Sequence, residues 1–235
     1  MALPLVNAPR YSTKLPSTGQ DVNYRPYTVK EEKVLMIALE SKDQKQILGA
    51  VKDVISGCVQ DIDVQELTTF DLEWMFLQLR SKAVGEKIDL KMKCQQDGCD
   101  GQTDITVDVE DIGIEGDPQQ KTIPITDTVG VTVRYPTIKL VENYDQEKLK
   151  SVEGAFDMII GCIDSIYDAD NVYDCKNENP EDVKGFVDNL TSDQFKQIGE
   201  FFESVPQVKH NLTWKCSKCG EQNEMVLEGL ESFFT

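Results

Sequence analysis

Two pairs of cysteines, far apart in the chain, constrain the fold more than any other feature of the sequence. Cys94 and Cys99 lie in the segment KCQQDGCDG, and Cys216 and Cys219 lie in WKCSKCGEQ. Each pair occupies a turn rich in glycine and polar residues, between stretches that alternate apolar and polar side chains as strands do. Because about half of the chain separates Cys99 from Cys216, a group bound by both pairs would join two distant segments.

Paired thiolates on tight turns are the usual ligands of a structural zinc ion. Tetrahedral Zn²⁺ with four sulfur ligands at about 2.3 Å is held in this way by two β-turns. We therefore expect a split zinc ribbon in which Cys94, Cys99, Cys216 and Cys219 bind one structural Zn²⁺. Two alternatives stay open: four reduced thiols on a ribbon that has lost its metal, and a redox pair at the CSKC motif. A redox pair belongs at the start of a helix, where the dipole lowers the thiol pKa, whereas this pair lies between predicted strands.

Catalytic chemistry has little support in the sequence. A catalytic zinc keeps one coordination position open and usually recruits histidine or a carboxylate, whereas four thiolates close the shell. The single histidine, His210, lies in the strand that leads to Cys216, where we expect it to face solvent. The sequence contains no GxxxxGK[ST] loop and no GxGxxG after a strand. We predict that the protein is not an enzyme and has no small-molecule substrate; a carboxylate pair unrecognisable from sequence is the remaining enzymatic alternative.

Composition limits the partners. The chain has 235 residues, of which 40% are hydrophobic, and a formal net charge of −18. Such a charge opposes binding to nucleic acid, which depends on Lys and Arg neutralising phosphates. No segment has the apolar core of a signal peptide or the ~18 apolar residues of a membrane span. We therefore expect a cytoplasmic protein without nucleic-acid or membrane partners, in which zinc explains the cysteine pairs better than disulfides do.

The order of predicted elements indicates an α+β fold, with helical layers packed on antiparallel strands and the split ribbon joining two distant hairpins. We divide the chain into five segments. These are an extended N-terminal arm (1–14), a hairpin with a helical subdomain (15–86), the first ribbon hairpin with further strands (87–136), a helical region (137–206), and the second ribbon hairpin with the C-terminal tail (207–235).

Capping signals predict where several helices begin. Thr28 with Glu31, Ser41 with Gln44, and Thr191 with Gln194 have capping-box spacing, and Asn179 followed by Pro180 is typical of a helix start. A further helix is predicted over 143–168, with Asn143 and Gln146 as its caps. In the first of these helices we expect the core face to consist of Val34, Leu35, Ile37, Ala38 and Leu39.

The remaining cysteines and the acidic run have ordinary interpretations. Cys58 and Cys162 lie in apolar helical patterns, where a small buried side chain is expected. The aspartates at positions 164, 168, 170 and 174 invite comparison with a calcium loop. Counting from Asp168, however, the EF-hand positions that need glycine and glutamate hold Tyr173 and Asn179. A solvated acidic loop that runs to Asn179 is therefore the prediction.

Two segments of the first third of the chain resemble a known family. LPSTGQDVNYRPYTVKEEKVLMIAL at 15–39 and FDLEWMFLQLRSKAVGE at 70–86 are similar to the signature of the baseplate hub subunits and hub assembly proteins of T-even-like contractile-tailed bacteriophages, the myoviruses. In that family a PSTG turn leads to an aromatic strand and then to a VKEEK helix start. With the cysteine pairs, the similarity spans most of the chain.

The resemblance implies a structural, non-enzymatic protein of the tail baseplate hub. Its partners would be other hub or wedge proteins, and its location would be the virion tail, after assembly in the host cytoplasm. Arg25 with the charged residues at 30–33 could anchor such contacts or could simply be solvated, and residues 1–14 and Phe233–Phe234 are further candidates. The alternative function is a cytoplasmic zinc-ribbon adaptor that binds nucleic acid or a polymerase.

Overall fold

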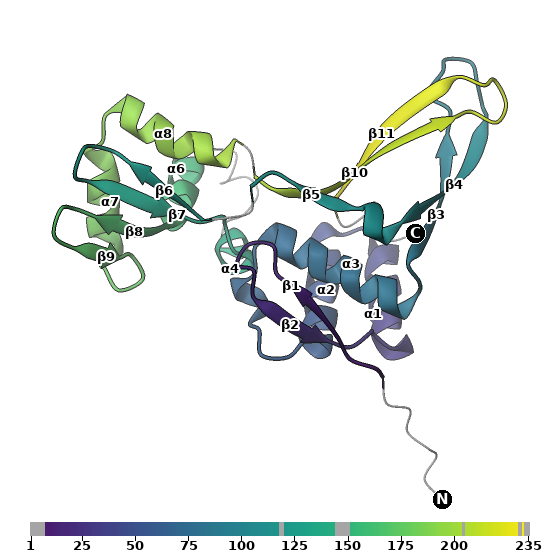
Figure 1. Cartoon of the computed structure of the whole chain (residues 1–235), viewed down its shortest axis with the longest axis horizontal. Coiled ribbons are helices and arrows are strands. Elements are labelled where there is room, and N and C mark those ends of the chain that lie inside the picture. The colour runs from purple at the N-terminus through teal and green to yellow at the C-terminus, as the bar shows by residue number, and fades with distance from the viewer. Residues whose placement is uncertain (1–7, 118–119, 144–150, 204, 230–231, 233–235) are drawn as a thin grey trace, which may run out of the picture. The chain divides into compact units, whose positions relative to one another are not determined.

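The computed structural model describes residues 8–117, 120–143, 151–203, 205–229 and 232. The chain divides into two compact units (Figure 1). Unit 1 contains Met1–Val64, Phe70–Glu115 and Gln207–Thr235, and unit 2 contains Gln65–Thr69 and Gly116–Pro206. Helices and antiparallel strands occur in both units, so the predicted α+β class is confirmed. The five predicted segment boundaries remain predictions.

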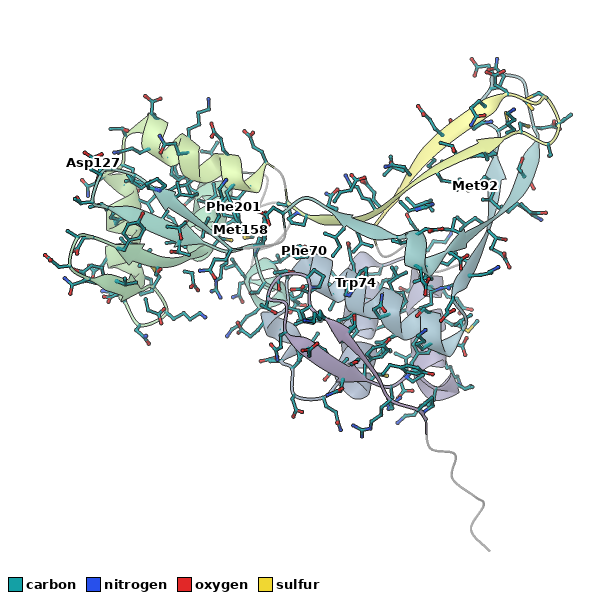
Figure 2. The ribbon with its side chains drawn as sticks, in the orientation of Figure 1. Phe70, Trp74, Met92, Asp127, Met158 and Phe201 are labelled. Carbon is teal, nitrogen blue, oxygen red and sulfur yellow. The ribbon has the colours of Figure 1, made fainter. Side chains whose placement is uncertain are left out.

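Unit 1 begins with a two-stranded hairpin that is fixed to a helix. β1 (Tyr11–Lys14) pairs with β2 (Asp21–Tyr24), so the hairpin begins inside the predicted extended arm. The backbone N–H and hydroxyl of Ser17, in the turn, donate to the carboxylate of Asp71 at 3.0 and 2.5 Å. Trp74 Nε1 donates to Thr13 Oγ1 at 3.3 Å. Asp71 and Trp74 both belong to α3 (Thr69–Ala83). Figure 2 shows this helix with Phe70 and Trp74 labelled.

The two helices before α3 begin as local side-chain chemistry dictates. α1 (Val29–Ser41) follows Thr28, whose backbone N–H donates to Glu31 Oε2 at 2.7 Å, as the capping signal predicted. α2 (Gln44–Cys58) is capped by Asp43, whose carboxylate accepts from the backbone N–H groups of Lys45 and Gln46. The predicted cap at Ser41 was wrong because α1 continues through that residue, and a carboxylate two residues later provides the better acceptor.

Arg25 is bound inside unit 1 and ties the hairpin to the two helices. Its guanidinium donates to Glu31 Oε1 at 2.8 Å, to the carbonyl oxygen of Gly57 at 2.9 Å and to that of Pro26 at 3.0 Å. Burial alone would raise the pKa of Glu31, but the hydrogen bonds from Arg25 and Thr28 outweigh it and lower this pKa to about 2. Because these contacts use the guanidinium within the fold, we no longer regard Arg25 as a free docking anchor.

Two longer hairpins complete unit 1, and they carry the cysteines. β3 (Lys87–Lys93) pairs with β4 (Gln102–Asp108), and β10 (Gln207–Lys215) pairs with β11 (Gln222–Glu228). The short strand β5 (Gly113–Glu115) adds to the free side of β10. The four strands of the long hairpins were predicted from the alternating pattern, whereas β5 was not. Their inward-facing side chains form one apolar cluster with α3, made of Leu77, Ile88, Leu90, Val107, Val109, Ile112, Val208, Leu212, Trp214 and Leu227.

Unit 2 contains a four-stranded antiparallel sheet in the order β6-β7-β8-β9. β6 (Lys121–Pro124) and β7 (Gly130–Val133) agree with the predicted strands, whereas β8 (Ile163–Tyr167) and β9 (Val172–Asp174) lie where helix and loop were expected. The turn between β8 and β9 is closed by Asp168, whose carboxylate accepts from the backbone N–H groups of Asp170 and Asn171, each at 2.8 Å. The acidic segment is therefore a hairpin rather than an irregular loop.

In the described residues of unit 2, four helices accompany this sheet: α4 (Ile138–Glu142), α6 (Val152–Gly161), α7 (Pro180–Asp188) and α8 (Ser192–Phe202). The caps of α7 at Asn179 and of α8 at Thr191 were predicted correctly. The helix predicted over 143–168 was wrong in part: Asn143 ends α4, α6 stops at Gly161, and the predicted cap Gln146 lies outside the described residues. No helix in the described part of the chain is long and apolar enough to cross a membrane.

A four-cysteine candidate metal centre

The four paired cysteines meet at the tips of the two long hairpins. Cys94 and Cys99 lie in the β3–β4 turn, and Cys216 and Cys219 lie in the β10–β11 turn. Their sulfur atoms all lie within 4.8 Å of one another. The Sγ atoms of Cys94 and Cys219 are 3.6 Å apart, and those of Cys99 and Cys216 are 3.8 Å apart. The fold therefore brings together the two pairs that the sequence singled out.

The backbone of each turn is folded tightly around its cysteines. In the first turn the N–H of Cys94 donates to the carbonyl oxygen of Gly101 at 2.8 Å, and the N–H of Gly101 points at Cys99 Sγ at 3.4 Å. In the second turn the N–H of Cys216 donates to the carbonyl oxygen of Glu221 at 2.9 Å. The N–H of Lys218 points at Cys216 Sγ at 3.4 Å. Each turn thus directs a backbone N–H at a sulfur atom, as it would at a thiolate that carries negative charge.

The separation of the sulfur atoms suits a tetrahedral metal ion. Four sulfurs at about 2.3 Å from a central Zn²⁺ would be about 3.8 Å from one another, which agrees with the Sγ–Sγ distances of 3.6 Å for Cys94 and Cys219 and 3.8 Å for Cys99 and Cys216. A disulfide would need about 2.05 Å, and all seven cysteines are free thiols. Soft thiolate sulfur favours Zn²⁺ over the hard ions Mg²⁺ and Ca²⁺. The donor set and its spacing therefore fit a closed four-thiolate zinc site.

Without a cation, the four thiols cannot all ionise. Hydrogen bonds from the backbone N–H groups of Cys219 and Lys218 lower the pKa of Cys216 to about 6. For Cys219, the backbone N–H of Glu221 lowers the pKa, but burial and hydrogen bonds with the other three thiols outweigh it and raise this pKa to about 12. One thiolate therefore forms readily, whereas further negative charge at the same place is opposed. A divalent cation would remove this opposition.

Asn223 connects the two turns. This residue begins the return strand β11 and is only 3% exposed. Its side-chain oxygen accepts from the backbone N–H of Gln95 at 2.7 Å, and its side-chain nitrogen donates to the carbonyl oxygen of Glu221 at 2.9 Å. One buried amide thus binds the backbone beside Cys94 in the first turn and the backbone beyond Cys219 in the second. Outer residues that hold metal ligands in place act in this way.

Ser217 makes a second connection between the hairpins. Its backbone N–H donates to Thr103 Oγ1 at 3.0 Å, and its hydroxyl donates to the carbonyl oxygen of Gln102 at 2.6 Å. A surface ion pair joins Lys218 to Asp100. Ser217 and Lys218 lie between Cys216 and Cys219, and their partners follow Cys99 in the chain. These contacts therefore join the second turn directly to the end of the first.

Gly101 leaves the room that the sulfur atoms need. A Cβ atom at this position would lie 2.5 Å from Cys216 Sγ, 2.9 Å from Lys218 Cβ and 3.2 Å from Cys99 Sγ. Among the glycines expected in these turns, Gly98 and Gly220 have positive φ angles of 79° and 76°, whereas the roles of Gly101 and Asn223 were not predicted from the sequence. A glycine or an asparagine is common near any turn, and only the meeting of two distant hairpins gives these two their roles.

The other candidate residues lie outside the cluster. Nδ1 of His210 lies 3.2 Å from the carbonyl oxygen of Asp111, to which the ring can donate. Cys58 and Cys162 are buried, as expected, and Cys175 is half-buried. Burial raises the pKa of Cys162 to about 12 and that of Cys175 to about 11. These thiols are therefore poor nucleophiles, since the thiolate is the reactive form.

Comparison with known proteins agrees with the resemblance carried by residues 15–39 and 70–86. No curated protein and no solved structure shows a significant match to this sequence. The family model described as T4 bacteriophage base plate protein matches residues 8–235. This match includes both long hairpins and the whole of unit 2. The chain therefore belongs to the T4 bacteriophage base plate protein family.

Proposed function

We propose that the protein is a non-enzymatic subunit or assembly factor of the baseplate hub, which acts through contacts with other hub or wedge proteins. Membership of the base plate protein family, over residues 8–235, is the observation that carries this proposal. In the described residues, the one cluster of metal-ligating side chains is the four-cysteine group, whose closed donor set favours a structural role over a catalytic one. The protein would act in the host cytoplasm during assembly and in the virion tail thereafter.

We further propose that Cys94, Cys99, Cys216 and Cys219 bind one structural Zn²⁺. The ion would fasten the tip of the β3–β4 hairpin to the tip of the β10–β11 hairpin. Two observations support it: the Sγ–Sγ distances of 3.6 and 3.8 Å, and the backbone N–H groups directed at Cys99 and Cys216. Because the ion would bind only where both hairpins are in place, its binding free energy would add to the stability of unit 1.

Replacing one ligand tests the metal proposal. Cys216→Ser should lower the zinc content of the purified protein from about one ion per chain to well below one, and should lower the unfolding temperature. Cys175→Ser is the matched control, because Cys175 is a free cysteine outside the cluster, and it should leave zinc content unchanged. Equal zinc content in wild type and Cys216→Ser by elemental analysis would contradict the assignment.

The hub role needs a test in infected cells. A tagged copy of the chain, produced during infection, should co-purify with hub or wedge proteins of the same phage. A phage that lacks the chain should accumulate tail intermediates without complete baseplates. Complete baseplates in the absence of the chain would overturn the proposed role. For the alternative adaptor function, a DNA- and RNA-retention assay at low salt is decisive, since the net charge of −18 predicts no retention.

A further inference from the structure

Helix α1 exposes an apolar stripe, which includes residues that were predicted to face the core. Leu35 and Ala38 are buried, as predicted, but Val34 and Ile37 are exposed. Val29 is 80% exposed, and Met36 and Ile37 are each 59% exposed. With 3.6 residues per turn, Val29, Met36 and Ile37 lie on one face of the helix. This face has no partner in the described part of the chain.

Charged side chains are arranged about the centre of this stripe in a symmetric way. Lys33 stands one helical turn before Met36, and Glu40 stands one turn after Ile37. Both side chains are exposed. Lys33 and Glu40 are about 10 Å apart along the axis, too far to pair with each other, and neither makes an ion pair among the described residues. The stripe is thus locally neutral, on a chain whose net charge is −18.

We propose that α1 is the contact surface between two copies of this chain, packed antiparallel about a twofold axis at Met36 and Ile37. In this arrangement Met36 of each copy would pack against Ile37 of the other. Lys33 of each copy would meet Glu40 of the other. A twofold contact of this kind uses the same patch on both copies, so each favourable pair occurs twice. A parallel arrangement would instead place like charges together.

The expected dimer is weak. α1 has 13 residues and is therefore about 20 Å long, so a helix pair buries less than the ~800 Å² per partner of a standard stable interface. The acidic surfaces of two copies also repel each other, although at 0.15 M salt the Debye length of about 8 Å confines this repulsion to close groups. Dimerisation should consequently depend on concentration and should appear in the high micromolar range.

Sedimentation velocity of the full chain, from about 10 to 500 μM in 0.15 M salt, tests the proposal. Lys33→Glu or Glu40→Lys alone would place two like-charge pairs in the interface, and we expect either change to raise the dimer dissociation constant at least tenfold. The double variant K33E/E40K should recover the wild-type constant. An equimolar mixture of the two single variants should form a heterodimer, because both of its charge pairs are then opposite in sign.

Lys184→Glu, which makes the same charge change at an exposed position of α7, is the control and should leave dimerisation unchanged. Circular dichroism checks that each variant is folded, as expected for exposed sites. A wild-type chain that stays monomeric at 500 μM would overturn the proposal. An unchanged dimer dissociation constant in Lys33→Glu would also overturn it, as would a double variant K33E/E40K that does not recover the wild-type constant. This inference does not depend on the metal or on the hub role.

Discussion

At the scale of single residues, the four-cysteine cluster depends on two neighbours that bind no metal. The Asn223 side chain makes one hydrogen bond with the backbone of each turn. Gly101 has no side chain, and a Cβ atom there would overlap Cys216 Sγ. Neither role could be predicted from the sequence, because each one depends on a contact between hairpins that lie far apart in the chain. The cysteines could be predicted, since their spacing within each turn already expresses metal-ligand chemistry.

Asn223→Ala should loosen the connection between the two turns. It leaves the backbone N–H of Gln95 without its acceptor, while the carbonyl oxygen of Glu221 keeps the bond from the N–H of Cys216, so we expect a loss of about 2 kcal/mol in unfolding free energy. Zinc affinity should fall by about 10- to 100-fold, measured by chelator competition. The spectrum of the cobalt-substituted protein should report altered ligand geometry.

The control for Asn223 is Asn211→Ala in the neighbouring strand. The exposed Asn211 side chain donates to Glu115 Oε1 at 3.1 Å, away from the cysteines, so its removal should leave zinc affinity and the cobalt spectrum unchanged. An unchanged zinc affinity in Asn223→Ala would show that the amide does not position the turns. If the wild type still binds zinc, the proposed metal site would stand even so.

Gly101→Ala should displace a ligand. The new methyl group would overlap Cys216 Sγ, so either the turn shifts or the sulfur leaves its place, and metal content or affinity falls at least tenfold. Gly113→Ala, in β5 of the same unit, is the control, because a Cβ there meets nothing within 4 Å. Elemental analysis and chelator competition on both proteins provide the measurement. Wild-type affinity in Gly101→Ala would contradict the steric argument.

At the scale of elements, predictions from local signals agreed with the structure, and predictions that depended on distant packing did not. The caps at Thr28, Asn179 and Thr191 are set within four residues, and the structure contains all three helix starts. The segment that became β8 was taken for a helix because a short apolar run such as MIIGCIDSI fits either period. Its pairing with β7 and β9 decides the matter, and no local signal reveals that pairing.

Glu73 of α3 is half-buried, and its carboxyl group makes stability depend on pH. Burial raises the pKa of Glu73 to about 7; the backbone N–H of Val208 opposes this shift and the charge of Glu228 adds to it. Since this pKa lies above the ordinary value of 4.5, the group favours the folded state most below pH 4.5, and this contribution is lost as the pH rises through 7. Lowering the pH from 8 to 5 should therefore raise the free energy of unfolding by about 2 kcal/mol.

Glu73→Gln isolates this effect. The variant should be more stable than the wild type at pH 8 and should lose the advantage as the pH falls to 5, as denaturant unfolding at several pH values would show. Glu224→Gln, at an exposed position of β11, should give a difference from the wild type that does not vary over this range. A pH-independent difference for Glu73→Gln would mean that its carboxyl group titrates normally in the folded protein.

At the scale of the whole molecule, most of unit 2 is an insertion into unit 1. Residues 116–206 belong to unit 2, and they leave unit 1 at Glu115 and return at Gln207. These two residues face each other as partners in the pairing of β5 with β10. The chain therefore leaves and re-enters unit 1 at a single point of one antiparallel ladder, where a hairpin turn could close it.

Replacing residues 116–206 by the two-residue turn Asn-Gly should leave unit 1 able to fold around the cysteines. The short segment Gln65–Thr69, which clusters with unit 2, loses its neighbours. We expect the shortened chain to bind one zinc ion with affinity within tenfold of the full chain and to unfold cooperatively. In the same background, Cys216→Ser should abolish binding. A shortened chain that is unfolded in the presence of zinc would show that unit 1 needs the insertion.

The insertion also sets the order of events during synthesis. Cys94 and Cys99 leave the ribosome before all of residues 116–206, and Cys216 follows Cys99 by 117 positions. At 5–20 residues per second this interval is roughly 6–25 s. For that time the first turn would be half of the proposed metal site, open to oxidation or to the wrong metal, while the sheet of unit 2 is being made. Closure of the cysteine cluster would thus mark a chain in which all of residues 116–206 have been synthesised.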